Sequence, residues 1–231
     1  MIMIKDRIEE SQETWDAIAE SFDKTRRRTW PQCIDFIDSL PKNNVVADIG
    51  CGNGRHLIPC ARHCKKVIGL DISKKLLDIV KNKSEQEKLN NILLLQCDAV
   101  KMPLKDNIID AALFIASLHN IRDRDNRIKA LKELKRILKK DGRALISVWS
   151  KYRDEYKKSF FDRITNKGKP AHGDTNIYWR QHGLNVPRYY HIYRKNKFIK
   201  ELEEANLEIV DFQEVKLHTK KHPDNYFSIV K

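Results

Sequence analysis

An aspartate followed by three alternating glycines lies in the segment VVADIGCGNG, which runs from Val45 to Gly54. Asp48 precedes Gly50, Gly52 and Gly54 at the point where a short apolar run ends. Because glycine has no Cβ, a turn built this way can adopt positive φ and let its backbone approach a ligand closely. The spacing differs from the GxGxxG of dinucleotide-binding turns, which leave room for a pyrophosphate. A carboxylate here would repel a phosphate and favours a ligand with a cationic, amine-bearing end.

Two further aspartates stand where predicted strands end. Asp71 closes VIGLD and Asp98 closes LLLQCD. An acid after the second strand can accept hydrogen bonds from both hydroxyls of a ribose, and an acid after the third can accept from an adenine amino group. Together with Asp48 they indicate S-adenosylmethionine as the cofactor. The alternative for each is a helix N-cap, a role that Asp71 also suits because Ile72 and Ser73 follow it.

The predicted cofactor site combines the glycine turn with the residues that follow the second, third and fourth strands. Its members are Asp48, Gly50, Cys51, Gly52, Gly54, Asp71, Ile72, Asp98, Ala99 and Ala116. No metal site is predicted, because Cys60, His63 and Cys64 have no second ligand pair at the spacing of a zinc finger or ribbon.

Alternating strands and helices must position these residues. The predicted strands cover 44–49, 66–70, 91–96, 108–115 and 143–149, and the predicted helices cover 55–63, 73–83 and 123–140. Strands separated by helices of this length imply right-handed crossovers and a parallel sheet. A helix at 196–205 and two strands at 207–217 and 226–230 predict a closing antiparallel hairpin. The expected fold is therefore α/β, with a doubly wound, seven-stranded, mostly parallel sheet of the Rossmann-like class I methyltransferase type.

The sequence predicts one methyltransferase domain in four parts. Residues 1–43 form a helical extension, with helices at about 5–21 and from Pro31 to Leu40, and residues 44–150 form the cofactor-binding core. Residues 151–195 are expected to be a substrate-side insertion that is basic, aromatic and largely irregular. Residues 196–231 supply the closing helix and hairpin.

The net charge and the cysteine content indicate which partners and which cellular compartment suit the protein. Lys and Arg number 45 against 32 Asp and Glu, which leaves a net charge of +13. Such a surplus attracts polyanions such as RNA, although a lysine-rich proteome would explain it equally well. Five cysteines without a signal peptide or a long apolar run predict a cytoplasmic protein with free thiols and no membrane segment.

Several longer motifs resemble one family. They are WDAIAESFDKTRRRTWP, DIGCGNG, GLDIS, ASLHN, RIKALKELKRIL, ISVWS, RYYHIY and DNYFSIV. Over nearly its whole length the chain resembles the wobble-uridine tRNA carboxymethyl methyltransferases of eukaryotic and archaeal type. The glycine and acid motifs belong to the whole superfamily of class I enzymes. The TR…WP segment, the histidine after the fourth strand and RYYH are much more specific to this family.

The resemblance implies an activity, a substrate and a partner. Members of that family methylate a carboxymethyl group on the wobble uridine of tRNA, using S-adenosylmethionine and a small zinc-ribbon activator protein with which they form a heterodimer. A carboxylate is already ionised at neutral pH, so catalysis needs in-line positioning and cations that hold the acid rather than a strong base. The residues that match the family's motifs, and that we expect to be catalytic, are Arg26, His119, Arg188 and His191.

Each of these residues has a structural alternative. His119 follows an apolar strand and would also suit a buried, hydrogen-bonded core position. Arg26 opens a basic run that would also suit a solvated face. RYYHIY predicts either a surface for phosphates and stacked bases or an amphipathic strand or helix that packs Tyr190 and Tyr193 inward. The chain also departs from the family at Asn120, where a second histidine is usual, and this leaves the exact nucleoside open.

The predicted third strand is an edge of the sheet, and its sequence NILLLQC is apolar on both faces. An unpaired apolar edge invites pairing unless something covers it. An activator protein that adds a strand there would cover it, and so would the N-terminal helices of the chain itself.

Two other functions fit the same fold. A methyltransferase acting on O, N or C of a small molecule would share the glycine turn, but the basic segment 151–190 and the net charge favour a polyanion. A non-catalytic RNA-binding subunit would have no reason to keep all three acids and all three glycines. The glycine spacing argues against a NAD-dependent enzyme.

Overall fold

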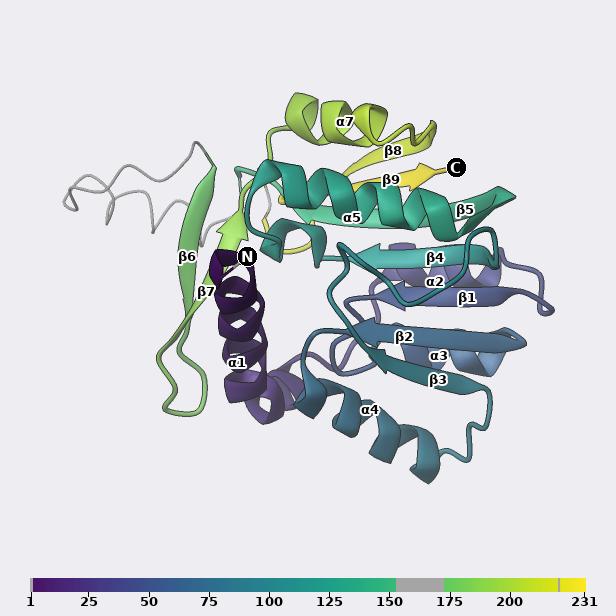
Figure 1. Cartoon of the computed structure of the whole chain (residues 1–231), viewed down its shortest axis with the longest axis horizontal. Helices are drawn as coiled ribbons and strands as arrows, with labels where there is room; N and C mark the ends of the chain where they lie inside the picture. The colour runs from purple at the N-terminus through teal and green to yellow at the C-terminus, as the bar shows by residue number, and fades with distance from the viewer. Residues whose placement is uncertain (1, 153–172, 220) are drawn as a thin grey trace.

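Seven strands form one sheet in the order β3-β2-β1-β4-β5-β9-β8 (Figure 1). The structure is a computed structural model and describes residues 2–152, 173–219 and 221–231. The strands are β1 Val45–Ile49, β2 Lys66–Asp71, β3 Ile92–Gln96, β4 Ile109–Ile115, β5 Leu138–Trp149, β8 Ile209–Val215 and β9 Asn225–Val230. Strands β1 to β5 run parallel, and β9 pairs antiparallel with both β5 and β8. The predicted fold class is confirmed.

The strand order reverses between β1 and β4. From β1 the chain first builds outward to β2 and β3, and then returns to add β4 and β5 on the other side. In such sheets a crevice opens at the carboxyl ends of the strands at this switch point. Both β1 and β4 carry buried side chains on alternate faces, as parallel strands covered by helices on both faces must.

Helices cover the two faces of the sheet. Helices α2 Pro31–Asp38, α3 Leu57–His63 and α4 Lys74–Gln86 contribute to one apolar core, and α5 Arg124–Ile137 and α7 Lys195–Glu204 contribute to the other. Alternation along β1 decides which residue enters which core: Val46 joins the first, and Ala47 and Ile49 join the second. Among the described residues, no helix has both the length and the apolar character needed to cross a membrane.

The junction of α5 and β5 differs from the prediction of a helix over 123–140. The helix ends at Ile137, and β5 begins at once with Leu138. The register between β4 and β5 then shifts, since Ile109 pairs with Leu138 but Ala111 pairs with Arg143. Asp141 and Gly142, directly after the predicted end of the helix, lie in this irregularity of the strand.

The insertion holds regular structure where the sequence predicted none. Strands β6 Asp174–Trp179 and β7 Val186–His191 pair antiparallel as a separate two-stranded sheet. The expectation of an irregular segment is therefore wrong for 174–191, while residues 153–172 lie outside the described part. Thr175 and Trp179 of β6, like Arg188 and Tyr190 of β7, are buried in alternation with more exposed neighbours. This is the period of a half-buried strand, and it supports the strand alternative for RYYHIY.

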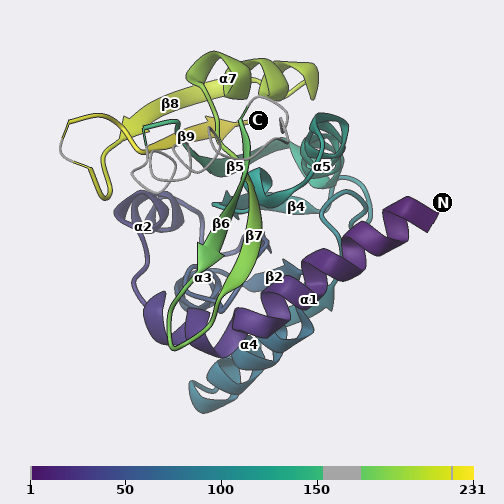
Figure 2. The same ribbon diagram turned by 90° about the vertical axis from the view of Figure 1, so that its left-hand side faces the viewer.

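Helix α1 Ile2–Thr25 and the β6–β7 hairpin lie across the end of the sheet at which the parallel strands finish (Figures 1 and 2). Helix α1 is longer than predicted and packs against α4 and β7. The two elements therefore wall the crevice at the switch point. The four-part division at 43, 150 and 195 stays a prediction.

Candidate active site

A cavity of about 780 Å³ lies at the carboxyl ends of the parallel strands. Its floor is the glycine turn after β1 together with the residues after β2, β3 and β4, and its walls come from α1 and β7. The cavity is thus built where the sheet changes direction, as expected for a doubly wound fold.

The glycine turn is fastened to the end of β2. The N–H groups of Gly50 and Cys51 both donate to the carbonyl of Leu70, at 2.7 and 3.0 Å. Gly50 has φ +67°, and a Cβ there would lie 2.3 Å from Oγ of Ser117. Gly52 has φ +55° and is therefore also in the left-handed region. These two positions require glycine, and the backbone between them lines the cavity.

Asp71 joins the turn to the second strand. Its Oδ2 accepts from the N–H of Gly52 at 2.7 Å, and its Oδ1 accepts from the N–H of Ser73 at 2.9 Å. Burial raises the pKa of Asp71 to about 6, although these backbone donors oppose the rise. The hydroxyl of Ser73, not the carboxylate of Asp71, caps α4 by accepting from Leu76 N–H. The carboxylate of Asp71 instead lines the cavity.

Most of the predicted cofactor residues meet at this cavity. Those that line it are Gly50, Cys51, Gly52, Asp71, Ile72, Asp98, Ala99 and Ala116. Burial also raises the pKa of Asp98, whose Oδ1 accepts from Val100 N–H at 3.1 Å. Gly54 packs against α4 instead, since a Cβ there would contact Val80 at 3.1 Å.

Asp48 lies beneath the turn rather than on the cavity wall. Its side chain is fully buried, and its Oδ2 has no hydrogen-bond partner among the described residues. Burial, and then the nearby Asp71 carboxylate, raise the pKa of Asp48 to about 7, although Arg55 opposes the rise. Because Asp48 does not line the cavity, it is not placed to contact a cofactor amine there.

Two cavity residues that the sequence did not single out have unsatisfied polar atoms. Asn53 donates to Asp23 and to the carbonyl of Arg26, but its Oδ1 has no partner in the described structure. His56 is buried with neither ring nitrogen bonded, and burial holds its pKa well below the usual value. An acceptor next to a neutral imidazole suits a ligand that has both donor and acceptor groups, such as an amino-acid end. The sequence could have indicated both residues, because Asn53 lies between the glycines of GNGRH and His56 follows them.

Arg188 has the most unusual environment in the cavity. It is only 6% exposed, and its Nη1 donates to the hydroxyl of Tyr190 at 2.5 Å. Its guanidinium lies 4.8 Å from the Trp179 ring centroid, 5.1 Å from that of Tyr190 and 5.7 Å from that of Trp15. No carboxylate pairs with it among the described residues, and its Nε has no partner. Since arginine stays charged when buried, this site carries an uncompensated positive charge.

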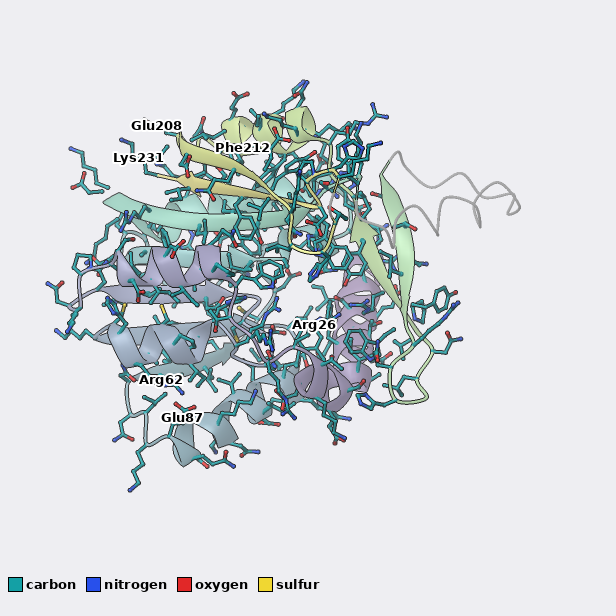
Figure 3. The ribbon with its side chains drawn as sticks, turned by 180° about the vertical axis from the view of Figure 1, so that it is seen from behind. Arg26, Arg62, Glu87, Glu208, Phe212 and Lys231 are labelled. Atoms are coloured by element: carbon teal, nitrogen blue, oxygen red, sulfur yellow. The ribbon has the colours of Figure 1, made fainter. Side chains whose placement is uncertain are left out.

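Arg26 reaches the same indole ring from the end of α1. Its guanidinium lies 5.1 Å from the centroid of Trp179, and its side chain lines the cavity. Figure 3 shows Arg26 beside α1 on the side that faces the sheet. Arg27 and Arg28 are exposed at the mouth. The two arginines predicted to be catalytic are therefore brought together on Trp179.

The two predicted histidines do not line the cavity. His119 is buried behind it and stacks on Tyr190 with ring centroids 5.2 Å apart. The backbone N–H of Trp149 donates to its Nδ1 at 3.1 Å, so the neutral ring carries its proton on Nε2. His191 lies on the other face of β7, with Nδ1 2.6 Å from Oδ1 of Asp174.

Comparison with known proteins identifies the central part of the chain. A family model described as a methyltransferase domain matches residues 47–146. The tRNA (carboxymethyluridine(34)-5-O)-methyltransferase alkbh8 of Xenopus tropicalis is 41% identical over 145 residues, which are 63% of this chain and 22% of that protein. The protein of the same enzyme name from Schizosaccharomyces pombe is 28% identical over 221 residues, covering 86% of this chain and 89% of the relative. The predicted resemblance is confirmed, although the chain spans less than a third of the length of the first curated relatives it matches.

Solved structures share the fold at low sequence identity. A SAM-dependent methyltransferase from Methanosarcina mazei has a TM-score of 0.69 at 19% identity, covering 88% of this chain and 97% of that chain. A chain in the complex between the Haloferax volcanii Trm112 methyltransferase activator and a methyltransferase has a TM-score of 0.68 at 13% identity, covering 94% and 96%. These likenesses establish the architecture of the chain and no more.

Proposed function

Since the chain carries a methyltransferase domain in the Rossmann-like class I fold, whose cofactor is S-adenosylmethionine, we propose that it methylates the carboxylate of a carboxymethyl group on the wobble uridine of tRNA. One observation carries this proposal: the buried guanidinium of Arg188 has no carboxylate partner among the described residues and faces the cavity. A buried positive charge of this kind favours an anionic substrate group. The relatives named for carboxymethyluridine methylation supply the identity of that group.

The residues at the cavity floor fit the cofactor. Asp71 offers a carboxylate to ribose hydroxyls, and Asp98 offers one to an adenine amino group. The unsatisfied atoms of Asn53 and His56 fit the amino-acid end. When bound, S-adenosylmethionine supplies a methyl group on a sulfonium, which an oxygen nucleophile can take. The remaining predicted residues, Gly50, Cys51, Gly52, Ile72, Ala99 and Ala116, would contact it through backbone and small side chains, and Asp48 would support the turn from below.

The substrate carboxylate requires holding rather than deprotonation, because it is already ionised at neutral pH. Arg188 and Arg26 supply the two cations, and both lie against the Trp179 ring, which helps to fix their positions. Rings stack behind Arg188, since Tyr190 lies 4.5 Å from Trp149 and 5.2 Å from His119 between centroids. We propose that His119 acts through Tyr190 as a positioning residue, and that His191 orients β7 through Asp174. Such preorganised positive charge lowers the barrier without any reorganisation during the reaction.

We further propose tRNA and a small zinc-ribbon activator as partners, and the cytoplasm as compartment. Strand β3 is an edge of the sheet, and its Leu93 is 41% exposed. A partner strand there would complete the ladder and cover this side chain. The structural relative bound to an activator supports the idea of a heterodimer. All five cysteines are free thiols, which suits a reducing compartment.

The test is transfer of labelled methyl from S-adenosylmethionine to total tRNA, with and without a zinc-ribbon protein, followed by nucleoside analysis. We expect label in the methyl ester of a wobble-position uridine. Label in another nucleoside would keep the domain's activity and reject the proposed target. Tight cofactor binding with no label in RNA would reject the tRNA proposal and indicate a small-molecule substrate.

A further inference from the structure

The β6–β7 hairpin has an outer face that is only partly packed, since its Tyr178 is exposed and its Tyr189 is half-buried. Tyr178 of β6 and Arg180, which follows the strand, are exposed, and in the pairing register Tyr178 lies opposite Pro187 of β7. Tyr189, two residues along β7, lies opposite Asn176 and points to the same side. The outer face consists of Tyr178, Arg180, Asn176, Pro187 and Tyr189.

The inner face of the hairpin holds it to the rest of the chain. Trp179 Nε1 donates to the hydroxyl of Ser21 on α1 at 2.7 Å, and Tyr190 stacks on Trp149 at 4.5 Å with an interplanar angle of 15°. By contrast, the Tyr178 side chain is 46% exposed. The Tyr178 ring is therefore open to a stacking partner, whereas the Trp179 and Tyr190 rings of the inner face are buried.

Each tyrosine of the outer face has an arginine against its ring. Arg180 lies 5.5 Å from the centroid of Tyr178, and Arg122 lies 5.0 Å from that of Tyr189. Arg122 also pairs with Glu10 at 2.8 Å, while the pairing of Arg180 with Tyr178 is at the surface. Alternating aromatic rings and guanidinium groups are the surface on which unpaired bases stack.

The outer face continues into the cavity. Pro187, Tyr189 and Arg122 line the cavity, whereas Tyr178 and Arg180 lie toward the hairpin tip. The tip is fixed near the basic run after α1, because Nδ1 of His182 lies 2.7 Å from the hydroxyl of Ser21. Exposed Arg27 and Arg28 follow that helix end. The path from the cavity to the tip is therefore aromatic and positively charged, in a chain whose net charge is +13.

We infer that the outer face of the β6–β7 hairpin is a stacking platform for the unpaired bases next to the target nucleotide of an RNA substrate. This inference rests on the proposed tRNA function and adds the surface that receives the strand. Tyr178 stacks one base, Tyr189 stacks the base nearer the cavity, and the arginines hold the intervening phosphates. Stacking is tolerant of sequence, since every base presents a π face.

The experiment measures affinity for an anticodon stem-loop RNA with a wobble carboxymethyluridine, by fluorescence anisotropy in the presence of S-adenosylhomocysteine. We expect Tyr178→Ala to weaken RNA binding about tenfold, because one stacked base is worth on the order of that factor. Arg180→Ala is expected to weaken it less. Tyr178→Phe keeps the ring and should bind as the wild type does. Val210→Ala, at an exposed position on β8, is the matched control and should leave the affinity unchanged.

A second readout reports contact directly. In Tyr178→Trp, added RNA should quench the indole emission more than it does in the wild type, which already holds four tryptophans, because the new indole would stack on a base. Methylation of RNA by the wild type together with unchanged RNA affinity of Tyr178→Ala would overturn the platform and leave the proposed function standing. A wild-type chain that neither binds nor methylates RNA would overturn both. Quenching by an activator protein instead of RNA would reassign the outer face to a protein partner.

Discussion

Arg188 combines nearly complete burial with an uncompensated charge, and its contacts require an arginine rather than a lysine at this position. Its guanidinium donates to Tyr190 and lies against three aromatic rings at once, which a lysine ammonium cannot do with the same geometry. We therefore expect Arg188→Lys to lower kcat/KM for RNA by about a hundredfold, and Arg188→Ala to lower it further. Steady-state methyl transfer measures this. Affinity for S-adenosylhomocysteine by calorimetry should stay at the wild-type value, and a matching loss of that affinity would contradict the assigned role.

The proposed ribose contact of Asp71 predicts that cofactor binding depends on pH. Burial raises the pKa of its carboxyl to about 6, so the group is ionised above that pH and protonated below it. Only the ionised carboxylate can accept from two ribose hydroxyls while it also accepts from Gly52 and Ser73. We expect the affinity for S-adenosylhomocysteine to fall as the pH drops from about 7 to about 5. Asp71→Asn should bind weakly with no such dependence, whereas a flat wild-type profile would rule out an ionised Asp71 as the ligand.

Asp48 should lower the stability of the chain at neutral and alkaline pH. Its pKa is raised from 3.8 to about 7 on folding, so the folded chain binds the proton more tightly than the unfolded chain. The cost of ionising it therefore grows as the pH rises through this window, and it is complete above about pH 7. Asp48→Asn is expected to raise Tm at pH 8 by about 4 °C or more, and to change it little near pH 4. Thermal unfolding followed by circular dichroism at both pH values checks this, and an equal gain at both would contradict it.

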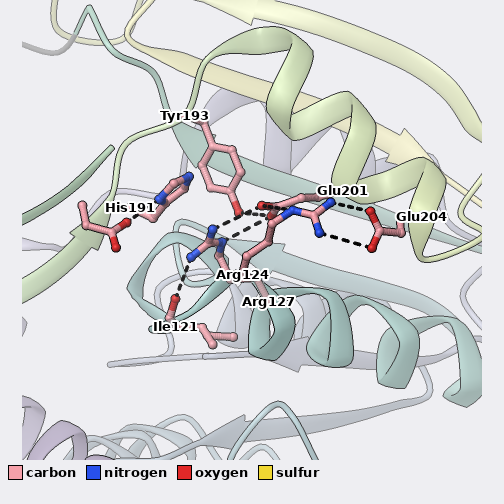
Figure 4. A network of polar contacts seen from close by, with 8 residues as sticks. Ile121, Arg124, Arg127, His191, Tyr193, Glu201 and Glu204 are labelled. Atoms are coloured by element: carbon pink, nitrogen blue, oxygen red, sulfur yellow. Dashed lines mark hydrogen bonds and ion pairs between the residues drawn. The ribbon is translucent and has the colours of Figure 1, made fainter. Parts of the chain in front are cut away.

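At the scale of elements, the hairpin is held to the core by a buried polar network (Figure 4). Arg127 of α5 donates to both carboxylate oxygens of Glu201 on α7, at 3.3 and 3.2 Å, and Tyr193 after β7 donates to the same carboxylate at 2.7 Å. Arg127 also donates to the carbonyl of Ile121 in the loop after β4. One ion pair therefore joins two helices, the end of the hairpin and a loop that lines the cavity.

Removing one partner of this pair should be costly. Glu201→Gln leaves the guanidinium of Arg127 buried without its counter-charge, and we expect a loss of about 3–5 kcal/mol in the free energy of unfolding. The neighbouring pair of Arg124 with Glu204 joins the same two helices, but its side chains are 45% and 41% exposed. Glu204→Gln should therefore cost much less than Glu201→Gln, because solvent screens an exposed pair. Urea unfolding of both variants tests the contrast, and equal losses would mean that burial does not decide the strength of the pair.

The same scale separates what the sequence could predict from what it could not. Apolar runs such as Val45–Ile49 are local patterns, and the strands predicted from them are present in the structure. Asp71 and Asp98, predicted from the residues that follow such runs, line the cavity at the carboxyl ends of the strands. The hairpin was missed because its period-two alternation lies within a basic, aromatic segment that favoured an insertion. The position of His119 behind the cavity depends on its stacking against Trp149 and Tyr190. Contacts of that kind join residues far apart in the chain, and no local pattern records them.

At the scale of the whole molecule, α1 roofs the cavity through polar contacts that the sequence did not indicate. Asp16 of α1 accepts from the hydroxyl of Ser73 at 2.5 Å and from the N–H of Lys75 at 3.1 Å, so it binds the N-terminus of α4. Asp23, one turn from the helix end, pairs with Lys83 and accepts from Asn53 at 2.8 Å. These contacts bring Arg26 to the cavity wall and leave Arg27 and Arg28 exposed beside it, where the proposed RNA substrate would enter.

That arrangement predicts a specific dependence on salt. Basic groups that neutralise RNA phosphates release counterions, so the logarithm of the affinity falls linearly with the logarithm of salt concentration, by about 0.7 per phosphate for single strands. Arg27 and Arg28 are exposed at the cavity and Arg188 is buried. In the proposed complex, Arg27 and Arg28 would bind RNA through charge alone, whereas Arg188 would bind one group. We expect the double variant Arg27→Gln/Arg28→Gln to weaken tRNA binding and to reduce the salt slope by between about 1 and 2. The variant Lys139→Gln, at the opposite end of the sheet, removes one charge from a surface pair with Asp110 and should leave the slope unchanged. Filter binding of tRNA over a range of potassium chloride measures both, and an equal change in slope for the two variants would mean that the net charge of the chain, rather than the mouth of its cavity, attracts the RNA.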